Sequence, residues 1–285
     1  ENFSNAPIAQ LDRVPGFEPG GYRFKSCSVH ICDVNMELIS FLACTQSDYL
    51  RKVNLFFGKG NKHAEKLYAE GFRKGILDPN ASWIEPQARD LVRKICEATD
   101  LSLPEISYKK EEGTVSKFLL RYKDGLESES VCIPMKFGNT LCVSSQVGCC
   151  RACAFCETGK MGLLRQLTTS EIISQVFVAK HVLKQEIRNI VFMGMGEPFD
   201  NYEAVMRSIS ILTCPTGLGF APSKITVSTS GKVPEIDRFA EEADPALNLA
   251  ISLNAPNDKI RSKLMPVNNE WNLLELRRSM EKYLA

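Results

Sequence analysis

The chain has 285 residues, 44% of them hydrophobic, and a formal net charge of +1 at pH 7. This length and composition are typical of a soluble globular protein with one large domain or two smaller ones. The near-zero charge excludes a general attraction to nucleic acid, so any such binding must depend on local basic patches. The apolar stretch at residues 38–44 is too short to cross a bilayer, and no membrane association is expected.

Eleven cysteines are a high count for a chain of this size. Disulfide-rich proteins are exported, but the N-terminus carries acidic residues and prolines where an export signal would be apolar. We therefore expect a cytoplasmic protein, in which clustered thiols indicate metal or redox chemistry.

Residues 1–35 contain repeated prolines and glycines without a helical or strand period, which predicts a disordered tail. The stretch at residues 9–22 resembles the conceptual translation of a transfer-RNA gene. This resemblance favours a start of translation at Met36, with residues 1–35 outside the genuine coding sequence. Cys27 and Cys32 then have no expected role.

Residues 36–105 are predicted to form a small helical accessory domain. The helical pattern runs from residue 46 to 99, and Pro86 lies near the start of its last helix. Residues 44–95 carry ten Lys or Arg against six Asp or Glu. This excess fits an ordinary solvated surface or a contact with the RNA backbone, and the domain is predicted to bind RNA in the second case.

Residues 106–139 are predicted to form a β-hairpin linker. Two extended runs, at residues 115–122 and 126–134, flank the turn sequence Lys123-Asp124-Gly125. The hairpin would join the helical domain to the rest of the chain.

Residues 140–285 show four strands that alternate with four helices. The expected strands are residues 141–146, 189–193, 224–229 and 247–253. The first expected helix is capped by Thr168 and Glu171, and the others span residues 201–212, 234–242 and 272–284. Four βα units in series predict an α/β fold with a parallel sheet, in the form of a partial (βα)6-type barrel.

Three cysteines, Cys149, Cys153 and Cys156, follow the spacing CxxxCxxC. A cuboidal 4Fe-4S cluster usually has four Cys ligands, so three leave one iron open. The amino and carboxylate groups of S-adenosylmethionine can bind an open iron, which predicts a radical enzyme. A zinc site is the alternative, but structural zinc normally has four protein ligands, and no second CxxC or HxxxH pair follows.

Each later strand is followed by a peptide suited to ligand binding. These peptides are Gly194-Met-Gly-Glu-Pro198, Ser228-Thr-Ser-Gly231 and Ser252-Leu-Asn-Ala-Pro256. Glycines allow close approach of the backbone, and Glu197 can accept hydrogen bonds from an ammonium group. Because active sites of barrel-like α/β folds lie at the carboxyl ends of the strands, we expect these peptides to share one rim.

At these motifs the sequence resembles the radical S-adenosylmethionine RNA methyltransferases of the RlmN/Cfr family, from about Met36 to the end. The matching segments are Cys142-Val-Ser-Ser-Gln-Val-Gly-Cys149, the CxxxCxxC spacing, Met193-Gly-Met-Gly-Glu-Pro198, Ser228-Thr-Ser-Gly231 and Leu249-Ala-Ile-Ser-Leu-Asn-Ala-Pro-Asn-Asp258. The resemblance implies a radical-SAM core in which Cys149, Cys153 and Cys156 hold a 4Fe-4S cluster. It also implies an S-adenosylmethionine site lined by Gly196, Glu197, Ser228, Ser252, Leu253 and Asn254. Asn254 stands where the family frequently has histidine.

The resemblance further implies catalytic roles for Glu129 and Cys142. Glu129 matches a family glutamate treated as a proton acceptor, and Cys142 matches a cysteine that helps to resolve a covalent enzyme–RNA adduct. The implied reaction is methylation of carbon 2 of an adenosine in large-subunit (23S) ribosomal RNA and in tRNA, in a monomer served by an electron donor such as flavodoxin.

The family's second, methyl-carrying cysteine has its position beyond Ala285, so we expect a C-terminally truncated radical-SAM core that is inactive by itself. Two alternatives stay open. One is a Cfr-type enzyme that methylates carbon 8 of the adenine. The other is an inactive metal-bearing RNA-binding remnant.

Overall fold

The structure, a computed structural model, describes residues 38–284. The predicted tail at residues 1–35, with Cys27 and Cys32, lies outside the described residues. None of the helices between residues 38 and 284 has the length and apolarity needed to cross a bilayer.

The N-terminal part is helical, as predicted. Its helices are α1 (Gln46–Phe57), α2 (Asn61–Lys74) and α3 (Arg89–Glu97), and its short strands β1 (Ile39–Ser40) and β2 (Thr99–Asp100) pair in parallel. Thr45 caps α1 by accepting a hydrogen bond from the Asp48 N–H, and Gly58 ends it in the left-handed conformation. Phe41 stacks on Phe72 in a buried aromatic cluster.

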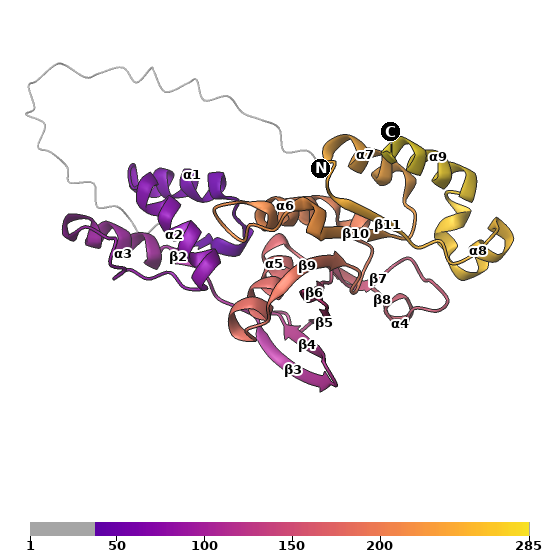
Figure 1. The fold of residues 1–285 in the computed structure, drawn as a ribbon, viewed down its shortest axis with the longest axis horizontal. Helices are drawn as coiled ribbons and strands as arrows, with labels where there is room; N and C mark the ends of the chain where they lie inside the picture. Colours follow the sequence, from indigo (N-terminus) through magenta and orange to yellow (C-terminus); the bar gives the residue numbers. More distant parts are fainter. Residues whose placement is uncertain (1–37, 285) are drawn as a thin grey trace, which may run out of the picture. The chain divides into compact units, whose positions relative to one another are not determined.

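A seven-stranded sheet forms the centre of the fold (Figure 1). Its order is β11-β10-β9-β6-β5-β4-β3. The strands are β3 (Glu105–Glu112), β4 (Val115–Arg121), β5 (Glu127–Met135), β6 (Gly138–Cys142), β9 (Ile187–Phe192), β10 (Ile225–Thr229) and β11 (Asn248–Ile251). β6, β9, β10 and β11 are parallel, which confirms the predicted parallel sheet.

The predicted hairpin is part of this sheet. β4 and β5 pair in antiparallel fashion around the turn at Asp124, and β5 continues the pairing to β6. The sequence did not predict β3, an exposed edge strand rich in Lys and Glu, because these residues have low β propensity.

Helices follow the parallel strands in the predicted order. They are α5 (Thr169–Phe177), α6 (Tyr202–Thr213), α7 (Val233–Glu242) and α9 (Leu273–Leu284), with a further helix α8 (Asp258–Leu264) before α9. Thr168 and Glu171 form the predicted capping box at the start of α5. The predicted apolar side chains of this helix, Ile172, Ile173, Val176 and Phe177, are all buried.

The first predicted strand, residues 141–146, is wrong in its bounds. β6 ends at Cys142, and residues 146–149 form a separate strand, β7 (Gln146–Cys149), which pairs with β8 (Gly162–Gln166). The cause is the buried side chain of Gln175, which accepts a hydrogen bond from the Ser144 N–H at 2.8 Å and donates one to the Ser144 carbonyl at 2.9 Å. Gln175 thereby takes the backbone groups that a neighbouring strand would need.

The two faces of the seven-stranded sheet differ, because successive side chains of a strand point to opposite faces. On one face Leu141, Ile190 and Val227 are fully buried in the core that includes residues of α5, α6 and α7. The other face, here called the open face, carries side chains that are mostly half-exposed. One register row across it contains Lys117, Val131, Cys142, Val191 and Thr226.

The helical N-terminal part contacts the α/β core directly. The Arg207 guanidinium on α6 lies 2.6 Å from the Asp48 carboxylate on α1. Phe72 of α2 packs edge-on against Phe177 of α5. Polar and apolar contacts therefore both hold the two parts together.

Candidate functional site

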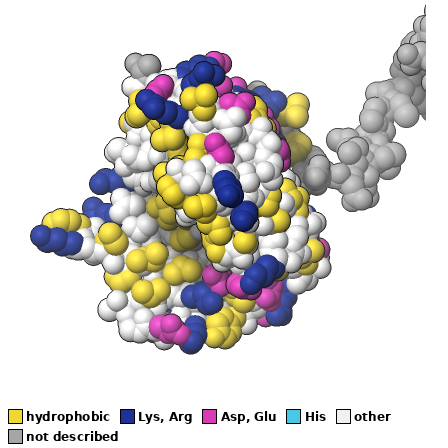
Figure 2. Space-filling model, turned by 90° about the vertical axis from the view of Figure 1, so that its right-hand side faces the viewer, with side chains coloured by type: hydrophobic (Ala, Val, Ile, Leu, Met, Phe, Trp, Pro, Cys, Tyr) yellow, Lys and Arg dark blue, Asp and Glu magenta, His cyan; other side chains and the backbone are white. Residues whose placement is uncertain are grey.

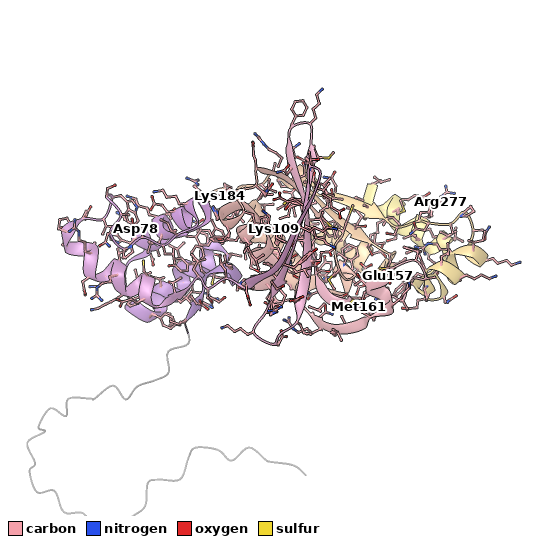
Figure 3. All side chains as sticks on the ribbon, turned by 90° about the horizontal axis from the view of Figure 1, so that it is seen from below. Asp78, Lys109, Glu157, Met161, Lys184 and Arg277 are labelled. Atoms are coloured by element: carbon pink, nitrogen blue, oxygen red, sulfur yellow. The ribbon has the colours of Figure 1, made fainter. Side chains whose placement is uncertain are left out.

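The cysteine loop connects β7 to β8. Cys149 is the last residue of β7, and Cys156 immediately precedes the short helix α4 (Glu157–Lys160). Within the loop the Cys156 N–H donates to the Cys153 carbonyl at 3.0 Å, and the Ala154 N–H donates to the Leu264 carbonyl of α8 at 2.8 Å. The second bond fixes the loop against the C-terminal helices. Figure 3 accordingly shows Glu157 and Met161 on the side of the molecule that carries Arg277, away from Asp78.

Successive thiols of the motif lie within electrostatic reach, Cys149 of Cys153 and Cys153 of Cys156. Burial raises the pKa of Cys149 to about 11, and the neighbouring Cys153 adds to this effect. Burial and Cys156 raise the pKa of Cys153 in the same direction. Between residues 38 and 284, no three His, Cys, Asp or Glu side chains lie close enough to hold one metal ion. Cysteine ligands of a cuboidal cluster each bind a different iron, so they need not converge on one point.

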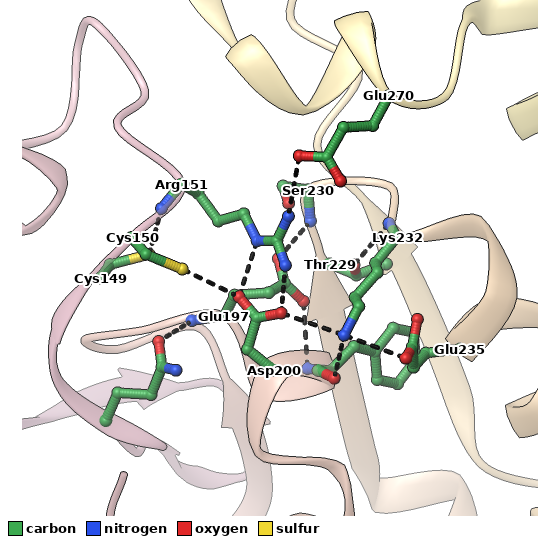
Figure 4. A network of polar contacts seen from close by, with 12 residues as sticks. Cys149, Cys150, Arg151, Glu197, Asp200, Thr229, Ser230, Lys232, Glu235 and Glu270 are labelled. Atoms are coloured by element: carbon green, nitrogen blue, oxygen red, sulfur yellow. Dashed lines mark hydrogen bonds and ion pairs between the residues drawn. The ribbon is translucent and has the colours of Figure 1, made fainter. Parts of the chain in front are cut away.

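An ion-pair network lies beside this loop (Figure 4). Arg151, between the first two motif cysteines, binds Asp200 through two nitrogens, and its Nε–Oδ2 distance is 2.7 Å. Lys232 Nζ lies 3.2 Å from Asp200 Oδ1, and Cys150 Sγ lies 3.4 Å from Oδ2. Burial would raise the pKa of Asp200, but Arg151 and Lys232 more than offset it and hold this pKa below its usual value. The network ties the cysteine loop to the segment after β9.

The glycines of the loop after β9 are required by close packing. A Cβ atom at Gly194 would lie 2.6 Å from the Ser144 hydroxyl and 2.8 Å from the Val143 carbonyl. Gly196 has a φ of +101°, and a Cβ there would lie 2.5 Å from the Gln146 side chain. These contacts hold the loop against the start of β7. The sequence alone indicated only that glycines allow close approach of the backbone.

Glu197 is buried, with 3% of its surface exposed. Its Oε1 accepts a hydrogen bond from the Phe199 N–H at 3.1 Å, and its Oε2 accepts one from the Ser230 N–H at 2.7 Å. Burial raises the pKa of Glu197, and these amides act in the opposite direction. The carboxylate thus joins the loops after β9 and β10.

The remaining predicted cofactor residues lie at the ends of β10 and β11. Ser228 is on the open face of β10, and Ser252 donates its N–H to the Thr229 carbonyl at 2.9 Å. Leu253 is exposed, and Asn254 has a φ of +55° with its side-chain amide 3.3 Å from Met265 Sδ. The structure therefore brings the loops after β9, β10 and β11 to the same end of the sheet, as expected.

Glu129 and Cys142 occupy neighbouring strands of the open face. Glu129 Oε2 lies 2.9 Å from Lys117 Nζ on β4, a partner that the sequence did not indicate. Burial raises the pKa of Cys142 to about 11, the Met193 N–H opposes this shift, and the charge of Glu129 adds to it. The two predicted catalytic residues are therefore within electrostatic reach of each other.

The residues present fit a cluster and a polar ligand. Three cysteines on one loop supply soft thiolate donors, which suit iron–sulfur clusters. The hydroxyl of Ser145, which is 2% exposed, has no hydrogen-bond partner among residues 38–284, although it lies between the end of β6 and the loop after β9. Figure 2 shows a hollow with hydrophobic walls on the side of the molecule that is to the right in Figure 1.

Comparisons with known proteins agree with this geometry. The sequence profile of the Radical SAM superfamily matches residues 143–282. A Protochlamydia amoebophila protein described as "Probable dual-specificity RNA methyltransferase RlmN 1" is 50% identical over 241 residues, which are 84% of this chain and 66% of the relative. A Dictyoglomus thermophilum protein described as "Probable dual-specificity RNA methyltransferase RlmN" is 39% identical over 239 residues, 83% of this chain and 68% of the relative. The chain belongs to the RlmN/Cfr family of radical S-adenosylmethionine RNA methyltransferases.

A solved structure supports the fold of this RlmN/Cfr family member. It is a radical SAM methyltransferase from Sphaerobacter thermophilus, with a TM-score of 0.78 and 35% sequence identity. The alignment covers 86% of this chain and 72% of the other. The predicted family and the predicted radical-SAM α/β core are confirmed. The chain spans about two thirds of the length of the two curated relatives.

One sizeable cavity in the described part of this family member lies away from these loops. It has a volume of about 690 Å³ and is bordered by the β4–β5 turn, by β8 and by the start of α5. Its residue Arg165 is already paired with Asp124 and Glu171, at 2.5 and 2.8 Å. The cavity contains none of the predicted site residues.

Sequence reasoning missed three charged groups near the candidate site of this family member. Arg151 and Asp200 stand next to the cysteine and Gly-Glu-Pro motifs, and this proximity was the available signal. Arg261 on α8 is fully buried behind the loops after β10 and β11. No local pattern around it distinguishes it from an exposed helical arginine.

Proposed function

We propose that the protein methylates carbon 2 of an adenosine in RNA, with large-subunit (23S) ribosomal RNA and tRNA as substrates. The observation that carries this proposal is the placement of the cysteine loop and the loops after β9, β10 and β11 at one end of the parallel sheet. The printed names of two relatives, dual-specificity RNA methyltransferases, support RNA as the substrate class.

Cys149, Cys153 and Cys156 would hold the 4Fe-4S cluster, and the three later loops would hold S-adenosylmethionine. When bound, the cluster and S-adenosylmethionine supply radical chemistry, which a carbon without a nucleophilic lone pair requires. Electrons would come from a small redox protein such as flavodoxin. Gly196 brings backbone close to the ligand, and Ser228, Ser252, Leu253 and Asn254 form the wall at the ends of β10 and β11.

Glu129 and Cys142 would act on the adenine from the open face. The Glu129 carboxylate oxygen accepts a proton, and the Lys117 ammonium 2.9 Å away keeps this carboxylate oriented. The Cys142 thiol, on the neighbouring strand, is placed to help release the product. The adenine must leave its stack to reach this face.

RNA docking would use the helical N-terminal part. Lys59, Lys62 and Lys66 are exposed, and the last two stand four residues apart on α2, so they share one side of the helix. Lys66 Nζ lies 5.2 Å from the centre of the Trp83 ring, which holds the ammonium near an aromatic surface. Such a patch suits phosphates, which a chain of net charge +1 cannot attract as a whole.

The experiment is an anaerobic methylation assay with a 23S ribosomal RNA fragment, S-adenosylmethionine and a reductant. The chain is tested alone and fused to the segment of the Protochlamydia amoebophila relative that follows the matched region, with that relative as positive control. The fusion should produce 2-methyladenosine, detected by mass spectrometry of the digested RNA. If 8-methyladenosine forms, the carbon-2 proposal is wrong. If the relative methylates RNA and a cluster-loaded fusion does not, the proposed activity is contradicted.

A further inference from the structure

Arg261 is the largest fully buried side chain in the described part of the protein. Its guanidinium donates hydrogen bonds to four neutral oxygens. Nε binds the Leu253 carbonyl at 3.1 Å, and Nη1 binds Asn268 Oδ1 at 2.8 Å. Nη2 binds the carbonyls of Ser230 and Ser252 at 2.5 and 3.1 Å. The charged group thus contacts backbone carbonyls and one amide.

A buried guanidinium is costly, because removal of its hydration is repaid only in part by neutral acceptors. An apolar side chain of similar size would fill the same space without this cost. The guanidinium provides a rigid, planar set of donors that can join several chain segments at fixed angles. The presence of a buried arginine at position 261, despite this cost, is therefore best explained by the chain segments that its guanidinium joins.

The joined segments belong to the proposed S-adenosylmethionine site. Ser230 follows β10, while Ser252 and Leu253 follow β11. The Ser230 N–H also binds Glu197 Oε2 at 2.7 Å, so the connection extends to the loop after β9. Gly231 has a φ of +110°, and a Cβ there would lie 3.1 Å from Arg261 Nη2. The chain is thus locally shaped to leave room for the guanidinium.

The helix that carries Arg261 contacts the cluster loop as well. The Leu264 carbonyl at the end of α8 accepts a hydrogen bond from the Ala154 N–H, inside the CxxxCxxC loop. Asn268 is held by Asp258 Oδ1 at 3.0 Å, and the same oxygen accepts the Leu273 N–H at 2.8 Å, at the start of α9. Arg261 is therefore at the centre of contacts that reach all the loops of the proposed site.

We propose that Arg261 is a positioning residue of the S-adenosylmethionine site. Its buried guanidinium holds the carbonyls of Ser230, Ser252 and Leu253, so that the segments after β10 and β11 have their binding conformation before the ligand arrives. A preformed site binds more tightly, because less conformational freedom is lost on binding. This inference rests on the proposed function, since it assumes that these segments bind S-adenosylmethionine.

The test measures binding of S-adenosylmethionine by titration calorimetry to anaerobically cluster-loaded protein. The variants are Arg261→Lys, which keeps the charge but loses the planar donor set, and Arg261→Met, which removes both. We expect the affinity to fall roughly 10- to 100-fold, the range typical of groups that orient a binding site from behind, with unchanged iron content. Arg277→Lys and Arg277→Met are the matched controls. Arg277 is 76% exposed, pairs with Glu281 in the next turn and should give wild-type affinity.

A second readout needs no ligand. Backbone amides of residues 229–231 and 252–255 should exchange hydrogen faster in Arg261→Lys than in the wild type, and those of α6 should not change. Arg261→Lys carries the test if Arg261→Met does not fold. Folded Arg261 variants with wild-type affinity, or with unchanged exchange in both segments, would overturn the inference. A cluster-loaded wild type that does not bind S-adenosylmethionine would instead overturn the proposed function, and the inference with it.

Discussion

Lys117 and Glu129 form an ion pair on the open face of the sheet, with 2.9 Å between Nζ and Oε2. Lys117 stands in the same register row as Cys142, with Val131 between them. The hydrogen bond that Lys117 donates to Glu129 raises the pKa of Lys117. Both side chains are partly exposed, so the pair adds little to stability, and the place of Lys117 in the register row of Cys142 is the more informative property.

The first prediction concerns this pair. In the fusion described above, Glu129→Gln should lower the methylation rate about 10²- to 10⁴-fold, because loss of a general base has effects of this size. Lys117→Met should lower it less, since it removes only the group that orients the carboxylate. Both variants should bind iron and S-adenosylmethionine as the wild type does. Lys110→Met, on the neighbouring strand β3, is the control, and equal losses for Lys110→Met and Lys117→Met would contradict the role of the pair.

The second prediction concerns Gly196. Gly196→Ala places a Cβ at a φ of +101° and 2.5 Å from Gln146, which is fully buried. Gly125→Ala is the matched control, because Gly125 also has a positive φ, +83°, but has no atom within 4 Å of a Cβ. The unfolding free energy of Gly196→Ala should therefore be lower than that of Gly125→Ala by about 1–3 kcal/mol, the usual cost of overpacking. Chemical denaturation measures the difference, and equal values would show that the loop after β9 adapts freely.

The sequence predicted α5 and the order of the parallel strands correctly, because their signals are local. The Thr168–Glu171 capping box and the helical spacing of Ile172, Val176 and their neighbours lie within one short segment. The early end of β6 could not be predicted, because Gln175, which satisfies the Ser144 backbone, is 31 residues away. Exposed β3 lacks the apolar alternation that marks a strand.

The candidate site follows the same rule. The cysteines and the Gly-Glu-Pro loop have recognisable spacing, whereas the contacts of Arg261 with Ser230, 31 residues apart, exist only in the folded chain. Lys117 and Glu129 come together only because β4 and β5 pair in one register. The sequence therefore identified the groups that we propose to touch a ligand and missed the groups that we propose to position them.

The third prediction is a pH dependence of stability. Burial lowers the pKa of His181 below its ordinary value of 6.5, and Lys180 and Lys184 act in the same direction. The unfolded chain therefore binds more protons than the folded one just below pH 6.5, and stability falls as the pH falls. His181 Nε2 donates to the Phe72 carbonyl at 2.9 Å, between α2 and the segment after α5. Protonation keeps this Nε2–H donor, so the expected loss of stability comes from burial of the positive charge near Lys180 and Lys184.

His181→Gln keeps a donor but cannot titrate. Its unfolding free energy, measured with urea, should fall less between pH 7.5 and pH 5.5 than that of the wild type. His63→Gln is the control, because His63 stacks on Trp83 within the helical part, outside this contact. If His181→Gln and the wild type lose the same stability, His181 is not the titrating group.

The fourth prediction concerns RNA docking. Simultaneous replacement of Lys59, Lys62 and Lys66 by Ala should weaken binding to a 23S ribosomal RNA fragment and flatten its salt dependence, since fewer counterions are released. A control triple variant replaces Lys184, Lys224 and Lys282, which lie outside the helical part. Fluorescence anisotropy at several salt concentrations gives both quantities. Unchanged affinity in the first variant would show that these three lysines form an ordinary solvated surface and do not bind RNA.

The most direct test of the central claim is the iron and sulfide content of anaerobically reconstituted protein. The wild type should bind about four irons and four sulfides, as a cysteine-ligated cuboidal cluster does. Cys153→Ala should lose the cluster, and Cys150→Ala should keep it, because Cys150 is exposed and its thiol lies 3.4 Å from Asp200. Full iron content in Cys153→Ala, or one zinc ion per chain in place of iron, would contradict the assignment of this loop to a radical S-adenosylmethionine cluster.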